Sequence, residues 1–92
     1  MIVRISNEGQ YRIPDEHQAR LNELDNAVVA AVAADEEDRF HADFEELLQF
    51  IRSKGVALGD DDLETSDVIV PPADLTLAEA EADFTGDGLI PD

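Results

Sequence analysis

Residues 35–55 read DEEDRFHADFEELLQFIRSKG, and this stretch decides the fold. Apolar side chains recur in it every three or four residues, which is the spacing of one face of an α-helix: Phe40, Phe44, Leu47, Leu48 and Ile51. Acidic residues crowd the first turn and basic residues occupy the last, and both placements suit the helix dipole. Asp35 can cap the start of this helix and Gly55 can end it. The pattern predicts an amphipathic helix that buries one side.

A second helix is predicted just before it, from about residue 16 to residue 34. Pro14 ends the preceding extended segment, Asp15 is a good N-cap, and Gln18 stands three residues later, as in a capping box. The apolar stripe of this helix consists of Leu21, Leu24, Val28, Ala31 and Val32. Because the link between the two helices is very short, we expect them to form an antiparallel hairpin.

The first 13 residues are predicted to form a β-hairpin that turns at Gly9. Alternation in its second arm places Tyr11 and Ile13 on one face and Gln10 and Arg12 on the other. A hairpin alone is marginally stable in water, so it must pack on another element.

A third strand is expected at residues 67–70, where Pro71 and Pro72 end it. An acidic loop at residues 59–67 precedes it, and a short helix with a tail follows at residues 76–92, starting from a capping box of Thr76 and Glu79. The prediction is a single α+β domain over residues 1–92 with the order ββααβα. In this domain a three-stranded sheet packs against the antiparallel helical hairpin.

Composition narrows the function more than any motif does. The chain carries 23 acidic and 6 basic residues, and its formal net charge is -17. Such a surface repels phosphate backbones and anionic lipid headgroups, so we expect no nucleic-acid ligand and no direct membrane insertion. At molar salt the Debye length falls to about 3 Å, so the composition suggests adaptation to a salt-loving organism's cytosol. The absence of cysteine and of a basic leader with an apolar segment favours a cytoplasmic protein.

Two acidic stretches resemble cation sites. Asp83, Thr85 and Asp87 stand at the spacing of calcium-loop ligands, but the printed sequence ends at Asp92, before the glutamate that such a loop needs at its twelfth position. Residues 60–64 hold four acids without a fixed geometry, which is typical of a solvated charge run. Both are weak candidates, so we expect no specific metal and no cofactor, and a small divalent-cation-binding protein remains the alternative function.

Catalytic chemistry is not indicated. His17 and His41 lie near the starts of the two long helices, and neither has a second histidine one turn away. No arrangement of serine, histidine and acid suggests a nucleophile with its base. We therefore expect no catalytic residues, and a small hydrolase is the least favoured hypothesis.

Four pieces of the sequence, taken together and in this order, resemble the PspA-associated domain family, PspAA. They are MIVRI with EGQYR (residues 1–5 and 8–12), LNELD (21–25), SDVIVPPAD (66–74) and GLIP (88–91). The resemblance implies a role in a phage-shock-type envelope stress response, beside PspA, a coiled-coil membrane-remodelling protein. The acidity is that of a haloarchaeal member, and it implies that any association with the membrane is peripheral and goes through the partner.

A non-enzymatic adaptor or regulator that binds a PspA-like protein is therefore the leading hypothesis. The candidate partner-binding residues are those expected on the outward side of the sheet and beside it: Arg4, Gln10, Tyr11, Arg12, Pro71 and Pro72. In this interpretation a mostly apolar patch docks, and acidic flanks select a basic surface of the partner. An equally weighted alternative is that the two arginines pair with acids of the same molecule. A homodimer through the sheet edges also remains open.

Overall fold

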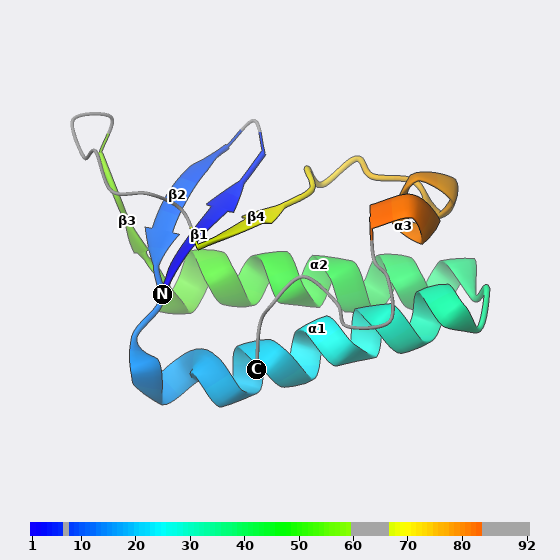
Figure 1. Cartoon of the computed structure of the whole chain (residues 1–92), viewed down its shortest axis with the longest axis horizontal. Helices are drawn as coiled ribbons and strands as arrows, with labels where there is room; N and C mark the ends of the chain where they lie inside the picture. Colours follow the sequence, from blue (N-terminus) through cyan, green and yellow to red (C-terminus); the bar gives the residue numbers. More distant parts are fainter. Residues whose placement is uncertain (7, 60–66, 84–92) are drawn as a thin grey trace.

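The computed structural model describes residues 1–6, 8–59 and 67–83, with the backbone alone at residues 82 and 83. Two helices, α1 (Gln18–Ala33) and α2 (Glu37–Lys54), lie side by side beneath a small mixed sheet (Figure 1). The strands are β1 (Ile2–Ile5), β2 (Gly9–Arg12), β3 (Val56–Ala57) and β4 (Val68–Val70). A 3-10 turn, η1 (Asp15–His17), precedes α1, and α3 (Leu77–Asp83) follows β4. The fold is therefore α+β, as the sequence predicts.

The sheet differs from the prediction, because the described part of the chain forms four strands in the order β3-β2-β1-β4 and not three. The additional strand, β3, pairs antiparallel with β2, with Tyr11 opposite Ala57 and Arg12 opposite Val56. Gly55 leaves α2 in an extended conformation (φ -79°, ψ 155°), so the next residues run along β2. The order is thus ββααββα rather than ββααβα. A strand of two residues is too short for its alternation to be read from a sequence.

The pairing of the other strands is as predicted. β1 and β2 form an antiparallel hairpin in which Val3 lies opposite Tyr11 and Arg4 opposite Gln10. β4 then pairs with β1 in parallel, with Val3 opposite Val68. Because side chains alternate along a strand, Val3, Tyr11 and Val68 share the face of the sheet that lies against the helices.

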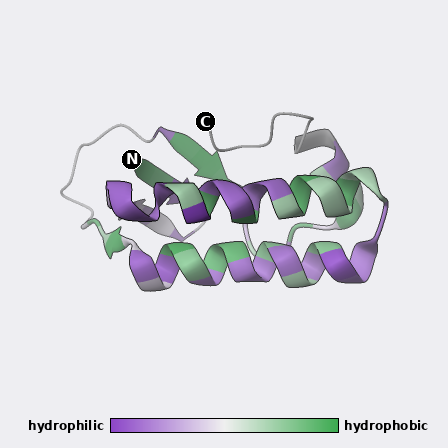
Figure 2. Ribbon diagram, turned by 90° about the horizontal axis from the view of Figure 1, so that it is seen from below, coloured by the Kyte–Doolittle hydropathy of each residue, from purple (hydrophilic) through white to green (hydrophobic). Residues whose placement is uncertain are grey.

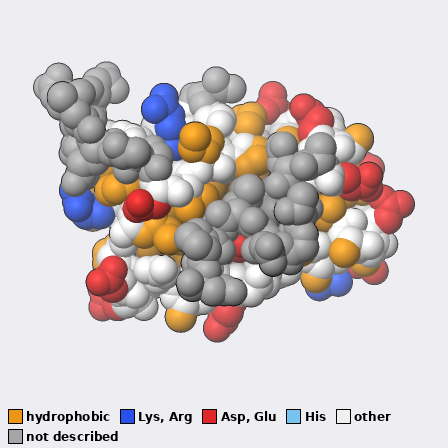
Figure 3. Space-filling model, viewed as in Figure 1, with side chains coloured by type: hydrophobic (Ala, Val, Ile, Leu, Met, Phe, Trp, Pro, Cys, Tyr) orange, Lys and Arg blue, Asp and Glu red, His pale blue; other side chains and the backbone are white. Residues whose placement is uncertain are grey.

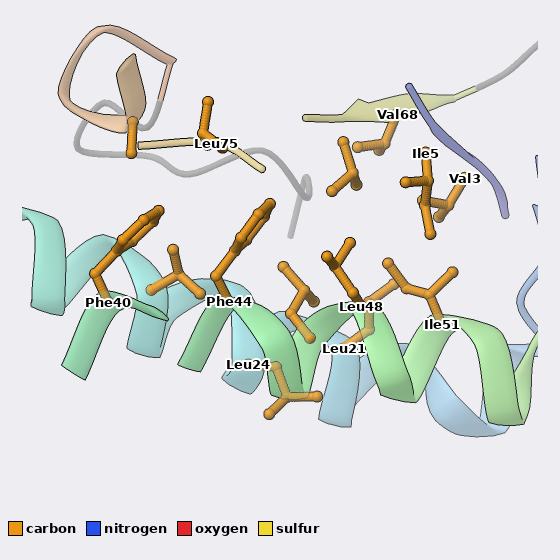
Figure 4. Close-up of a cluster of buried hydrophobic side chains, with 14 of the residues drawn as sticks. Val3, Ile5, Leu21, Leu24, Phe40, Phe44, Leu48, Ile51, Val68 and Leu75 are labelled. Carbon is orange, nitrogen blue, oxygen red and sulfur yellow. The ribbon is translucent and has the colours of Figure 1, made fainter. Parts of the chain in front are cut away.

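The hydrophobic core lies between the sheet and α2, and between α2 and α1. The predicted stripe of α2 is buried throughout, and no member is more than 2% exposed: Phe40, Phe44, Leu47, Leu48 and Ile51. In Figure 4, Leu48 and Ile51 point toward Ile5 and Val68 of the sheet, whereas Phe40 and Phe44 point toward Leu75. The whole predicted stripe of α1 is buried as well. One helix therefore contacts both the sheet and the other helix.

Asp35 ends α1 and does not cap α2, which corrects the prediction. Its φ is 57°, in the left-handed region that glycine normally occupies. The Asp35 amide donates to the Val32 carbonyl at 3.0 Å, and the Glu36 amide donates to the Ala31 carbonyl at 3.1 Å. These two bonds are those of a Schellman motif. The N-cap of α2 is Glu36, which makes no side-chain capping bond.

The predicted capping box at Asp15 is wrong for a related reason. The His17 amide donates to the Pro14 carbonyl at 3.0 Å, so a tight 3-10 turn starts at the proline and takes Asp15 into itself. α1 then begins at Gln18, and its N-cap, His17, makes no side-chain capping bond. Proline favours this outcome because its ring fixes φ and it has no amide hydrogen to satisfy.

The capping box at the start of α3 is confirmed. The Glu79 amide donates to Thr76 Oγ1 at 3.2 Å, and the Thr76 amide donates to Glu79 Oε1, also at 3.2 Å. The reciprocal pair satisfies two amides that the first turn of a helix leaves without a partner. The predicted end of this helix, near residue 84, lies outside the described residues.

Truncating the stripe of α2 tests its central role. We expect Phe44→Ala to lower the free energy of unfolding by about 3–5 kcal/mol, because the side chain is buried and stacks on Phe40 with ring centroids 5.5 Å apart. The exposed Gln49→Ala on the same helix is the control and should change it by less than about 0.5 kcal/mol. Denaturant unfolding in concentrated KCl measures both. Equal effects of the two substitutions would contradict the packing described here.

Asp35→Gly is expected to stabilise the protein by about 0.5–1 kcal/mol, because glycine removes the steric cost of the left-handed conformation. Asp35→Ala separates this effect from that of the charge, since alanine removes the carboxylate and keeps the Cβ atom. Thermal unfolding of the two variants side by side gives the measurement. If alanine stabilised as much as glycine, backbone strain at Asp35 would not be the cause.

Candidate partner-binding surface

The outer face of the sheet, on the side away from the helices, collects three of the six predicted docking residues: Arg4, Gln10 and Arg12. Arg4 and Gln10 lie opposite each other on β1 and β2, and Arg12 lies opposite Ile2. The pairing of the strands also places two apolar residues on this face: Val56, which lies opposite Arg12, and Ile69, which lies opposite Arg4. The outer face is therefore defined by Arg4, Gln10, Arg12, Val56 and Ile69. The alternation predicted for the hairpin brings the first three together as expected.

Its two edges carry exposed apolar side chains. Val56 on β3 is 58% exposed and Ile69 on β4 is 60% exposed, and these are the exposed large hydrophobic residues of the described chain. Arg4 and Arg12 are exposed between them, and within the described residues Arg4 forms no ion pair. A face that combines exposed apolar and basic groups is typical of a protein interface.

Tyr11 belongs to the other side of the sheet. It is half-buried opposite Val3, and its hydroxyl donates to Glu8 Oε2 at 3.3 Å. An open hollow of about 290 Å³ between the β1–β2 turn and the residues that follow β3 is lined by Tyr11 together with Arg4 and Gln10. Tyr11 is therefore placed next to the outer face but not on it.

The two prolines border a second open hollow, of about 400 Å³. Pro71 is buried and Pro72 half-buried, directly after β4. The hollow is lined by both prolines and by Ile69, Leu75 and Glu79 among others, so it adjoins the outer face through Ile69. The predicted residues thus lie in three adjoining places and not in one patch.

A polar network that the sequence does not reveal holds the β1–β2 turn onto α2. Arg52 Nε donates to both carboxylate oxygens of Glu8 at 3.0 Å, and Arg52 Nη2 lies 2.8 Å from Glu8 Oε1. The hydrogen bond from Arg52 lowers the pKa of Glu8, and its charge adds to this effect. Burial and the neighbouring Glu8 carboxylate raise the pKa of Tyr11. The turn is thereby fixed beside the outer face.

No metal site is found in the part of the chain that the structure describes, where no three acidic, histidine or cysteine side chains are arranged to hold an ion. Of the weak candidates, Asp83 is the last residue of α3 and its side chain is not described, while Thr85 and Asp87 lie outside the described residues. The acidic run at residues 60–64 also lies outside them.

The histidines have structural surroundings. His17 packs edge-on against Phe50, with ring centroids 5.9 Å apart. His41 is exposed beside Phe40. His17 Nε2 lies 3.7 Å from the carboxylate of the adjacent, exposed Glu16.

Charge is distributed unevenly over the molecule. Red acidic side chains gather in Figure 3 at the end that carries α3 and the α1–α2 connection and also lie along the lower edge, and blue side chains lie over the sheet and again at the acidic end. The acidic end includes Asp35 and Glu81, whose carboxyl groups share a hydrogen bond that raises the pKa of Glu81. Arg4 and Arg12 lie at the opposite end, where they form the basic part of the outer face.

One buried acid was missed by the sequence analysis. Asp25 of α1 is only 1% exposed, and the nearby Asn22 Oδ1 is buried without a hydrogen-bond partner in the described structure. Asp25 stands four residues after Leu21 and three before Val28, so it lies on the apolar stripe of α1. This position is the sign in the sequence that could have indicated its burial. α1 changes from polar residues at its start to hydrophobic residues at its end (Figure 2). Asp25 lies between these two halves.

Comparison with known proteins supports the family resemblance found in the sequence. The model of one family, described as PspA-associated protein (PspAA), matches residues 1–92. The chain belongs to the PspA-associated protein family. Comparisons with curated proteins and with solved structures find no match. The association of the family with PspA is thus the functional information that these comparisons supply. Among the described residues of this PspAA chain, no helix is long and apolar enough to cross a membrane.

The Glu8–Arg52 pair predicts a pH-dependent part of the stability. Because the pKa of Glu8 in the folded state lies below its ordinary value of 4.5, the pair stabilises the fold above that pH and loses its effect as the pH falls through the folded-state pKa. Glu8→Gln should therefore lower the free energy of unfolding by about 0.5–1 kcal/mol at pH 7. Denaturant unfolding at several pH values should show this difference disappear in acid. A difference that stayed constant from pH 7 to pH 3 would contradict the assignment.

Proposed function

We propose that this chain is a non-enzymatic adaptor that binds a PspA-type protein through the outer face of its sheet. The observation that carries the proposal is the coincidence of two facts. The chain belongs to a family described by its association with PspA, and the exposed large hydrophobic residues of its described surface lie on the sheet face opposite the described helices α1 and α2. Burying such residues against a partner is the main driving force of most protein association.

Two observations support a binding function rather than a catalytic one: membership of the PspA-associated family and the open shape of the hollows beside the sheet. The hollows beside the outer face are open to solvent and lack a nucleophile paired with a base among their lining residues. In this proposal the chain works in the cytoplasm, reaches the membrane only through its partner, and tunes a phage-shock-type stress response. The acidic remainder of its surface keeps it soluble at high salt and away from anionic lipid.

Binding is tested with a purified PspA-type protein of the same organism, by co-elution from a sizing column in molar KCl. We expect a complex at micromolar concentrations. Val56→Ser combined with Ile69→Ser should weaken it about tenfold or more, because each removes apolar area that binding would bury.

The matched control is Ala30→Ser combined with Ala33→Ser, which removes exposed apolar groups from α1 instead. This pair should leave the complex unchanged. No complex with the wild-type chain, or equal weakening by both double variants, would contradict an adaptor that uses the outer face.

A further inference from the structure

We propose that the hollow bordered by Pro71 and Pro72, called the proline hollow below, receives a basic segment of a protein partner. One large apolar side chain of that segment enters the hollow, and its lysines or arginines contact the acidic residues beside it. This inference rests on the proposed function, under which the segment belongs to the PspA-type protein, and it states the chemistry of the part that binds. The hollow measures about 400 Å³, which is more than one leucine or phenylalanine side chain fills.

Apolar groups form most of the walls of the proline hollow. Pro71 and Leu75 are buried and Pro72 is half-buried, while Ile69 adds an apolar wall that is 60% exposed. An apolar side chain that enters removes its own surface and part of these walls from water, and this favours binding. The hollow is therefore suited to an apolar side chain.

The charged residues that line the proline hollow are both acidic. Asp74 and Glu79 are exposed, and neither forms an ion pair within the described residues. Arg4 lies opposite Ile69 on the neighbouring strand and repels basic groups from the sheet. Complementary charge therefore directs the basic residues of the segment to the side of the hollow that holds Asp74 and Glu79.

Hydrogen bonds hold these walls in place before any partner binds. The Leu75 amide donates to the Pro72 carbonyl at 3.1 Å and closes the turn that contains Asp74. Glu79 Oε1 accepts from the Thr76 amide at 3.2 Å and from the Thr76 hydroxyl at 3.0 Å, so both acids belong to ordered local structure. A site whose walls are already arranged loses little conformational entropy on binding.

The sheet edge beside the hollow favours recognition by side chains over an added strand. β4 has only three residues, and the two prolines that follow it have no amide hydrogen. Backbone pairing along this edge would therefore end where the hollow begins. A helix presents side chains without needing such pairing, so we expect the segment to bind as a helix.

The composition of the chain argues for a partner and against a second copy as the occupant. The occupant must carry basic groups beside a large apolar one, and this chain has 6 basic residues against 23 acidic ones. Three of the six, Arg20, Arg39 and Arg52, already pair with acids of their own molecule. Two copies also repel each other through their like net charge.

The test uses two synthetic amphipathic peptides of about 18 residues, long enough to be helical. Both carry leucines along one face, flanked by lysines in the first peptide and by glutamates in the second. Fluorescence anisotropy is measured in the lowest KCl concentration at which circular dichroism shows the chain folded. We expect the lysine peptide to bind, and Asp74→Asn combined with Glu79→Gln to weaken it about fivefold or more.

Both substitutions keep the local structure, because asparagine suits a turn as aspartate does and glutamine can accept the same capping bonds. The matched control is Asp15→Asn combined with Glu16→Gln, which makes the same change at two exposed acids of η1, at the opposite end of α1 from α3 (Figure 1). The control should keep the lysine peptide. Equal weakening by the two double variants, or tighter binding of the glutamate peptide, would overturn the proposal.

A second pair of variants tests where the leucines bind. Ile69→Ser should weaken the lysine peptide about tenfold, because it removes an apolar wall of the hollow. Val56→Ser is its matched control, since Val56 is 58% exposed but stands on β3, the other edge strand of the sheet. This control should leave binding unchanged. Equal weakening by both would mean that the peptide lies across the outer face and would overturn the proposal.

The same variants separate this inference from the proposed function. A complex with the PspA-type protein that survives Asp74→Asn with Glu79→Gln would overturn the inference and leave the adaptor role intact. Absence of that complex, together with binding of the lysine peptide that depends on the two acids, would overturn the adaptor role and support the hollow as a binding site. Sedimentation should show a monomer; a dimer that the same double variant dissociates would mean that a second copy occupies the hollow and would overturn the inference.

Discussion

The burial of one stripe of α2 is the interaction on which the other layers depend. Its five apolar side chains contact α1 on one side and the sheet on the other, and each is 2% exposed or less. Burying a side chain of this size stabilises a fold by about 1.5–3 kcal/mol. The strands could not supply this themselves, because no described strand exceeds four residues and short strands without a packed face are unstable in water. The outer face exists as a rigid surface only because α2 supports the sheet from beneath.

That dependence explains how much of the fold is predictable. The stripe of α2, the alternation at Tyr11 and Arg12, and the capping box at Thr76 are local patterns, each with one physical solution. They place both helices and the hairpin, while the parallel direction of the strand at residues 68–70 is known only from the structure. The same alternation gathers Arg4, Gln10 and Arg12 on one face, so the basic part of the outer face could be read from the sequence. The family resemblance seen in the sequence is also confirmed.

The structural features that the sequence does not predict depend on contacts between distant parts of the chain, or on residues that can take two local roles. Aspartate suits an N-cap and also tolerates the left-handed conformation, so the sequence does not say which role Asp35 takes. The chain passes from α2 into β3 at Gly55, where a Cβ atom would lie 2.5 Å from the Ile51 carbonyl oxygen and 2.9 Å from Tyr11 Cβ. Val56 therefore reaches the outer face by a tertiary contact. Asp25 reads as a surface acid although its position lies on the stripe, because a charge is buried only where the fold supplies a suitable environment.

The central position of β1 has a consequence for synthesis on the ribosome. β1 is the strand nearest the N-terminus, yet it lies between β2 and β4, and residues 68–70 pair with it last. During translation the hairpin can close early, while the other edge of β1 waits for more than sixty residues to emerge. An unpaired edge of this kind can capture strands of other nascent chains. The excess of acidic over basic residues along the chain would then protect the unfinished protein by keeping such chains apart, a benefit separate from anything its finished surface binds.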